Sequence, residues 1–263
     1  MSLRLLPREA YGAVRPLLTQ WEVRSHRPLA QVLFDGLQDG KVYADDAERP
    51  TTALICPANG FCFACGEPRT DFVRALLPEL QTDLPEKPEL YATSAAWRTA
   101  LAPLFAGTVH RLGFDHDGRR AVPPAPLAGL SLVPIEPWMR TRWNPAGDRS
   151  GLDPWIFDIW GGPAGFAARS FGLAILSEWQ PVAFTAACAI GGGEAEVEVG
   201  TASAWRQRGL ATAACHAFMA ECRRRSLSPT WTCQAENTAS IALAKRLGYR
   251  VTEDVWGFPL EAG

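Results

Sequence analysis

A short glycine-containing loop stands between a strand pattern and a helix pattern, and this order constrains the fold of the second half of the chain. Glu194 to Val199 alternates in the manner of a strand, whereas Ala211 to Arg225 has apolar side chains at helical spacing. Between them lies Arg206-Gln207-Arg208-Gly209-Leu210-Ala211. The first N–H groups of a helix lack internal partners and carry partial positive charge. Because glycine lets an anion approach the backbone and arginine adds charged donors, the loop predicts an anion site.

A second block of sequence, downstream of this loop, strengthens the interpretation. Pro229 to Cys233 reads as the next strand, and Asn237 to Tyr249 reads as a helix that ends in Leu-Gly-Tyr. Together with the loop, this block resembles the two motif blocks of the GNAT superfamily of acyl-CoA-dependent N-acyltransferases. The matching residues are Arg206, Gly209, Ala211, Asn237, Ser240, Leu247, Gly248 and Tyr249.

The resemblance covers residues 172–256 well and the first half more loosely, through Gly40 to Asp45. Further details are similar to the GNAT subfamily that includes the zwittermicin resistance acetyltransferase. These details are Glu196-Val197, Thr201, Arg206, Gly209-Leu210-Ala211, Pro229 and Trp231. The resemblance implies acetyl-CoA as cosubstrate, a small-molecule amine as acceptor, and no metal.

In GNAT enzymes the pantetheine arm of CoA pairs with the end of a strand, and the pyrophosphate lies on the first turn of the next helix. The resemblance assigns the arm to Val199 to Thr201 and the pyrophosphate to Gln207 to Thr212. Asn237 would bond the arm, although a helix N-cap is an equally supported role. The residues implied to bind the cosubstrate are Val199, Gly200, Thr201, Arg206, Gln207, Arg208, Gly209, Leu210, Ala211, Thr212, Asn237 and Ser240.

Acyl transfer to an amine also needs a base, because an ammonium must lose a proton before it can attack. Glu194, Glu196 and Glu198 share one face if their strand is regular, and a solvated surface is an equally supported reading of three such acids. The resemblance makes Glu196 the first candidate base and Glu198 the second. A β-bulge in this strand would change which glutamates face the cleft.

One position departs from the family pattern. Many GNAT enzymes have a tyrosine seven residues after the asparagine, as a general acid for the thiolate, and here that position is Ala244. Tyr249 lies past the helix and is a candidate core residue. The subfamily that the chain resembles also tends to have alanine there, so the departure does not itself predict loss of activity.

The chain divides into halves at a proline-rich segment, Ala121 to Leu127, because proline disfavours both helix and inner strand. We expect domains at 1–125 and 126–263 in a mixed α/β fold with a largely antiparallel sheet and flanking helices. The second half is expected to have the GNAT fold and the first to be a degenerate GNAT-like copy, because its elements follow a similar order. In the first half, Gly66 to Asp71 lacks the loop spacing and carries two acids, so only the second half is expected to bind CoA.

Individual elements follow from periodicity and turn residues. In the first half, a hairpin turn at Pro57 to Gly60 separates two strands, and a helix from Thr70 is expected to stop before Pro78. The expected strands are residues 41–44, 52–56, 61–65, near 90, 109–114, 171–176, 182–189, 194–199, 230–233 and 251–258. The expected helices are residues 8–18, 28–37, 70–77, 95–105, 211–225 and 238–247.

Composition excludes several classes of protein. The 263 residues are 47% hydrophobic with a net charge of −2, so no overall basic field favours nucleic acid. The chain shows neither a bilayer-spanning apolar run nor a signal peptide, and we expect a cytoplasmic protein. Seven cysteines indicate buried thiols in a reducing compartment, and the Cys62 to Cys65 pair reads better as part of a strand than as a metal site.

The acceptor is not identified by the sequence. Trp138, Trp143, Trp155 and Trp160 gather in one segment, where they either line an acceptor pocket or, as the commoner case, pack the domain interface. We expect an acetyl-CoA-dependent N-acetyltransferase acting on a small amine, with an aminopolyol-type antibiotic among the candidate acceptors. The alternative is a GNAT-fold protein that binds CoA or regulates a partner without efficient catalysis.

Overall fold

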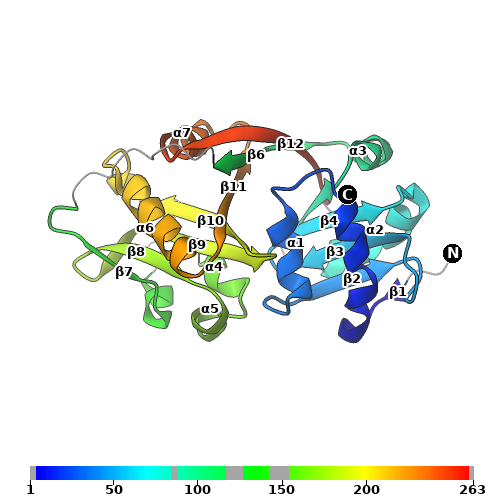
Figure 1. The fold of residues 1–263 in the computed structure, drawn as a ribbon, viewed down its shortest axis with the longest axis horizontal. Helices are drawn as coiled ribbons and strands as arrows, with labels where there is room; N and C mark the ends of the chain where they lie inside the picture. Colours follow the sequence, from blue (N-terminus) through cyan, green and yellow to red (C-terminus); the bar gives the residue numbers. More distant parts are fainter. Residues whose placement is uncertain (1–3, 84–87, 117–126, 143–153, 261–263) are drawn as a thin grey trace. The chain divides into compact units, whose positions relative to one another are not determined.

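The computed structural model describes residues 4–83, 88–116, 127–142 and 154–260, which form two compact units (Figure 1). Unit 1 comprises Met1–Gly113 together with Thr252–Gly263, and unit 2 comprises Phe114–Val251. The chain passes between units within β6 (Val109–His116) and again within β12 (Tyr249–Pro259). Most of the proline-rich segment around the expected boundary at residue 125 lies outside the described residues.

Unit 1 begins with a short edge strand, which pairs antiparallel with β2 (Gly40–Ala44), and with three helical elements. These are β1 (Arg4–Leu5), the 3-10 helices η1 (Arg8–Ala13) and η2 (Arg15–Gln20), and α1 (Arg27–Phe34). An antiparallel meander follows, made of β2, β3 (Thr52–Pro57) and β4 (Phe61–Gly66). The unit continues with α2 (Thr70–Asp83), β5 (Glu89–Ala92), α3 (Ala95–Leu101) and η3 (Ala102–Leu104). β5 runs parallel to β4, and on its other edge it pairs antiparallel with the end of β12.

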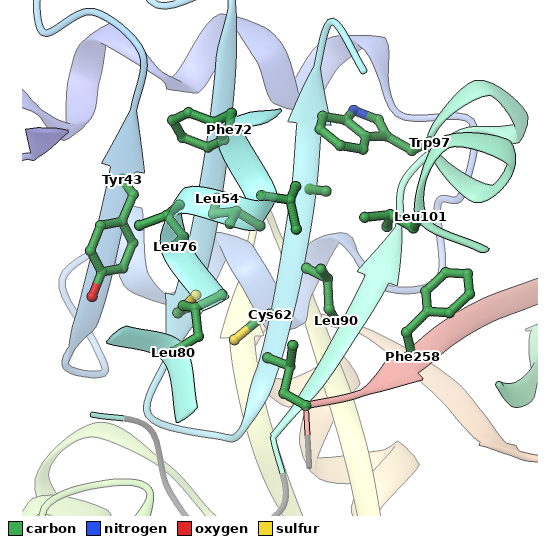
Figure 2. Packing of buried hydrophobic residues seen from close by; sticks show 14 of the residues in the cluster. Tyr43, Leu54, Cys62, Phe72, Leu76, Leu80, Leu90, Trp97, Leu101 and Phe258 are labelled. Atoms are coloured by element: carbon green, nitrogen blue, oxygen red, sulfur yellow. The ribbon is translucent and has the colours of Figure 1, made fainter. Parts of the chain in front are cut away.

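Pro78 does not end its helix, contrary to the expectation from the sequence, because α2 continues through it to Asp83. A proline inside a helix removes one hydrogen bond and crowds the preceding turn. Burial on one face of the helix offsets that cost, since Phe72, Val73, Leu76 and Leu80 pack into the core of unit 1. Figure 2 shows this cluster, with Trp97 and Leu101 of α3 packed alongside.

Unit 2 repeats this plan. Ahead of its main strands lie β7 (Ser131–Pro134), η4 (Pro137–Thr141), α4 (Trp155–Asp158) and α5 (Pro163–Arg169). The main strands are β8 (Gly172–Ser177), β9 (Gln180–Gly191) and β10 (Glu194–Thr201), which are antiparallel to one another. They are followed by η5 (Ser203–Trp205), α6 (Leu210–Arg224), β11 (Ser228–Gln234), parallel to β10, and α7 (Thr238–Arg246).

The two units share one order of elements: an antiparallel meander, a helix, a strand parallel to the last meander strand, and a second helix. The predicted mixed α/β class with a largely antiparallel sheet and flanking helices is confirmed. The first half also has the strand order that its interpretation as a GNAT-like copy requires. In the described parts of the chain, no helix is both long and apolar enough to cross a membrane.

A buried histidine lies in the aromatic part of the unit 1 core. His26 is 1% exposed, and its ring lies 4.9 Å from that of Tyr91 and close to those of Phe61 and Phe63. Its neighbour Ser25 donates to the carboxylate of Glu253 on β12 over 2.7 Å. Burial, and then the positive charge of Arg111, lower the pKa of His26 well below 6.5.

We therefore expect His26 to make the stability of unit 1 depend on pH. The unfolded chain protonates His26 near its ordinary pKa and the folded chain does not. The free energy of unfolding is therefore unaffected by protonation of His26 above about pH 6.5. Below that pH it falls by up to about 1.4 kcal/mol per pH unit. His26→Phe keeps an aromatic ring without the titration. Urea unfolding between about pH 7.5 and 5.5 should show a shallower decline for this variant, and identical slopes would contradict the expectation.

Candidate functional site

Strands β10 and β11 pair only at their beginnings. The parallel register runs from Glu194 opposite Ser228 to Glu196 opposite Thr230, and among the described residues no later pair is found. β10 nevertheless continues to Thr201 and keeps its antiparallel partner β9 to that point. In Figure 1, β11 turns away from β10. Beyond Glu196, the β11 side of β10 therefore has a backbone edge that pairs with no strand in the described part of the chain.

The carboxylate of Glu196 lies where the strands part. Glu196 is 2% exposed, and its Oε2 accepts a hydrogen bond from Thr230 Oγ1 over 2.5 Å. Its Oε1 accepts from both the backbone N–H and the hydroxyl of Thr232, each over 2.8 Å. The carboxylate thus bridges β10 to the part of β11 that no longer pairs with it. Sequence reasoning did not identify the two threonines, although Thr-x-Thr alternation in the next strand was a usable signal.

Glu198 has different surroundings. It is half-buried, lies opposite Ala186 on β9, and comes after the last β10–β11 pair. Burial, and to a smaller extent the negative charge of Glu198, raises the pKa of Cys215 on α6 to about 12, so Glu198 lies near α6. The β9–β10 register also shifts between Glu196 and Val197, where Cys188 of β9 is the extra residue. The bulge thus lies in the partner strand β9 and not in the glutamate strand itself, and the two acids have distinct neighbours.

The loop between β10 and α6 has the backbone conformation that its sequence predicts. Gly209 is the N-cap of α6 with φ +78°, and Gln207 has φ +60°, so both occupy the left-handed region. Arg206 Nε donates to the carbonyl of Thr201 over 3.3 Å, which ties the loop to the end of β10. The guanidinium of Arg208 lies 4.7 Å from the Trp205 ring centroid. The predicted loop residues and strand-end residues are therefore adjacent.

This arrangement fits an anionic ligand with an extended arm. The first turn of α6 contains no acidic residue, and Gly209 has no side chain to cap its N–H groups. Arg206, Gln207 and Arg208 are all exposed, so charged and polar donors surround that helix end. Within the described part of the chain, Thr201 Oγ1 is buried without a hydrogen-bond partner. These groups match a pyrophosphate at the helix and a polar arm along β10.

The side chains of the second motif block, residues 237–249, make contacts that stabilise the fold. Asn237 is the N-cap of α7, and its Oδ1 accepts from the Ser240 backbone N–H over 3.0 Å. The Ser240 hydroxyl accepts from Trp231 Nε1 over 3.1 Å. Ala244 is fully buried, and Tyr249 is a core residue whose hydroxyl donates to the carbonyl of Pro229. Burial raises the pKa of Tyr249, which makes it a poor proton donor.

The tryptophan segment is only partly buried where it is described, because Trp160 lies in the core while Trp138 and Trp155 are half-buried. Trp160 is fully buried and donates from Nε1 to the carbonyl of Ala187 over 3.1 Å. Asp158 is paired with Arg140 at 3.2 Å, and Trp143 and Asp153 lie outside the described residues. All seven cysteines are buried free thiols, as expected, and Cys62 and Cys65 lie within β4.

Comparison with known proteins agrees with this geometry. Residues 153–256 match the family model described as GNAT acetyltransferase. A protein of Bacillus subtilis (strain 168) called "Uncharacterized N-acetyltransferase YdfB" is 28% identical over 233 residues, covering 84% of this chain and 86% of that protein. Solved structures show the same fold at low identity. A GCN5-related N-acetyltransferase-like protein from Streptococcus suis 89/1591 has a TM-score of 0.70 at 20% identity, covering 95% of this chain and 97% of its own.

A second solved structure bears on the repeated plan of the chain. A tandem GNAT protein from the clavulanic acid biosynthesis pathway has a TM-score of 0.62 at 12% identity, with full coverage of both chains. The fold of this protein is thus the GNAT fold. The family match and the relative's name support a transferase of the N-acetyltransferase class, and the more specific zwittermicin-resistance resemblance is not confirmed.

Proposed function

We propose that the chain transfers an acetyl group from acetyl-CoA to the amine of a small molecule, and that unit 2 carries the reaction. The observation that carries this proposal is the meeting of an uncapped α6 N-terminus, flanked by Arg206 and Arg208, with the partnerless edge of β10. We assign the pyrophosphate to the backbone of residues 207–212 and the pantetheine arm to Val199 to Thr201. Asn237 caps α7 and Ser240 accepts from Trp231 of β11, and we propose that both also line the cosubstrate site.

Acetyl-CoA, when bound, supplies an activated thioester, and the chain must supply the proton transfers. We assign removal of the ammonium proton to Glu198, because it is half-buried beyond the point where the strands part. Glu196 is the alternative base, although its two oxygens already accept three hydrogen bonds. With Ala244 at the usual tyrosine position and Tyr249 in the core, we assign protonation of the leaving thiolate to solvent.

Ala244 at the usual tyrosine position and Tyr249 in the core also support a second candidate function, which is binding of acyl-CoA without efficient catalysis. A GNAT-fold protein that binds acyl-CoA without efficient turnover needs neither a general acid nor a base, and Ala244 cannot act as a general acid.

For the catalytic function, we propose that the acceptor is a small amine. The details shared with the zwittermicin-resistance subfamily point to an antibiotic amine as the first acceptors to screen. The buried thiols favour a reducing compartment, and we propose the cytoplasm.

Glu198→Gln separates the two functions. We expect an amine panel with acetyl-CoA to release CoA thiol, and the variant to lower kcat by about 100-fold or more, because a positioned base typically contributes that much. The dissociation constant for acetyl-CoA should stay unchanged, and the matched variant Glu194→Gln, at the start of β10, should retain activity. Thiol release that is equal in wild type and Glu198→Gln would remove Glu198 from the reaction. Binding of acetyl-CoA with no turnover on any amine would favour the second function.

A further inference from the structure

We infer that Glu196 is a positioning residue that keeps β10 and β11 apart, so that the β10 edge beyond it remains available to the arm of an acyl-CoA. The identity of that ligand rests on the proposed function. The separation of the strands does not, because it is a property of the folded chain. The inference therefore assigns Glu196 and Glu198 different tasks, although their spacing in the sequence makes them look equivalent.

The backbone N–H of Thr232 lies beyond the last pair of β10 and β11. In a parallel ladder that continued past Glu196 and Thr230, this group would donate to a carbonyl oxygen of β10. It donates instead to Glu196 Oε1 over 2.8 Å. The side chain thus takes the place of a strand carbonyl, and the β11 backbone is satisfied while the strands diverge.

Burying a carboxylate is costly unless hydrogen-bond donors surround it. Glu196 is 2% exposed, and a carboxylate in such a place needs hydrogen-bond donors to remain there. The hydroxyls of Thr230 and Thr232 and the Thr232 N–H supply three. This set fixes the carboxylate against β11, which suits a bridge between strands better than a base that must meet a substrate.

Unit 1 contains the equivalent pair of parallel strands, β4 and β5. Glu196 is the third residue after the hairpin glycine Gly193, and the third residue after Gly60 is Phe63. Phe63 lies opposite Tyr91, and the parallel ladder then continues to the next pair, Ala64 and Ala92. Where a phenylalanine replaces the glutamate, the strands stay together for one more pair.

Side chains then cover the remaining backbone edge in unit 1. Thr93 Oγ1 donates to the carbonyl of Ala64 over 2.6 Å, and Trp97 Nε1 donates to that of Gly66 over 2.9 Å. Counted from the hairpin glycines, these carbonyls correspond to those of Val197 and Val199 in unit 2. Figure 2 shows Trp97 within the unit 1 core. Side chains therefore cover the β4 edge in unit 1, whereas the corresponding β10 edge in unit 2 has no pair with β11 beyond Glu196. We expect one acyl-CoA site per chain.

The test compares Glu196→Ala with Glu196→Gln, because the amide oxygen of glutamine can still accept from Thr232 but cannot act as a base. Amide hydrogen exchange at Thr232, measured by NMR without ligand, should quicken about tenfold or more in Glu196→Ala and at most about threefold in Glu196→Gln. Titration calorimetry with acetyl-CoA should show the same ranking in dissociation constant. In steady state, Glu196→Ala should raise KM for acetyl-CoA more than it lowers kcat. The control Glu194→Ala should change none of these.

Two results would overturn the inference. One is wild-type protection of Thr232 in Glu196→Ala, and the other is a glutamine variant as impaired as the alanine variant. If Glu196→Ala does not fold, Thr230→Val removes a single donor, and about threefold faster exchange at Thr232 is then expected. Exchange that responds as expected in a protein that binds no acetyl-CoA would refute the proposed function and leave the role of Glu196 intact.

Discussion

Replacing Gln207 by aspartate is expected to weaken acetyl-CoA binding by about tenfold or more, whereas Gln207→Asn should leave it within about twofold. Gln207 is exposed and has φ +60°, a conformation that asparagine and aspartate tolerate better than other residues with a side chain. Both variants should therefore fold as the wild type does. They are close to isosteric and differ in one negative charge.

The expected loss follows from electrostatics at the start of α6. Two like unit charges about 6 Å apart repel by about 0.7–3 kcal/mol for effective dielectric constants between about 80 and 20. A pyrophosphate on the first turn of α6 would experience that repulsion. An acid near a helix N-terminus stabilises the helix itself, so weaker binding could not be ascribed to a weakened fold.

Titration calorimetry on the two variants, with circular dichroism to verify folding, measures this effect. The difference between aspartate and asparagine should shrink as salt is raised, because exposed charges are screened. Equal affinities for Gln207→Asp and Gln207→Asn would place the pyrophosphate elsewhere on the molecule.

The largest effect on stability is expected for Trp97→Ala, at about 3–5 kcal/mol. Trp97 is fully buried and lies in the unit 1 cluster with residues from α2, β4 and β5 (Figure 2). Its removal leaves a large cavity and deprives the Gly66 carbonyl of its indole donor. Trp97→Phe fills most of the volume but lacks the N–H, so it should cost about 1–3 kcal/mol.

Urea unfolding followed by tryptophan fluorescence and circular dichroism compares the two variants with the wild type. A matched surface variant is Trp179→Ala, because Trp179 is 70% exposed and should change the free energy of unfolding by less than about 0.5 kcal/mol. A Trp97→Ala protein as stable as Trp179→Ala would show that unit 1 does not depend on the closure that Trp97 makes.

Local patterns in the sequence predict most elements of both units. The alternation from Glu194 and the helical spacing from Ala211 agree with β10 and α6 to within a few residues. The glycine at the loop is a sound guide because the backbone at the N-cap of α6 takes a positive φ, whereas the positive φ of Gln207 is not indicated by its residue type. Asn237 likewise caps a helix as its residue type and position predict.

Non-local contacts account for what the sequence did not predict. The hydrogen bonds that the Glu196 carboxylate accepts come from Thr230 and Thr232, which lie 34 and 36 residues away. The continuation of α2 through Pro78 depends on burial of one helix face against strands elsewhere in the chain. The pairing of Gly257 to Pro259 with β5 joins residues from the two halves of the sequence, and no local pattern indicates such a pairing.

The central claim is that unit 2 binds one acyl-CoA through the start of α6 and the edge of β10. Thermal unfolding with acetyl-CoA, with desulfo-CoA and with ATP tests it most directly. A ligand at about 100 times its dissociation constant stabilises a one-site protein by roughly 2.7 kcal/mol, so acetyl-CoA and desulfo-CoA should raise Tm while ATP does not. With an affinity about tenfold weaker, Gln207→Asp should show roughly half of the stabilisation, about 1.4 kcal/mol, whereas Gln207→Asn should keep nearly all of it. No shift at millimolar acetyl-CoA would contradict the claim and leave the loop with a purely structural role.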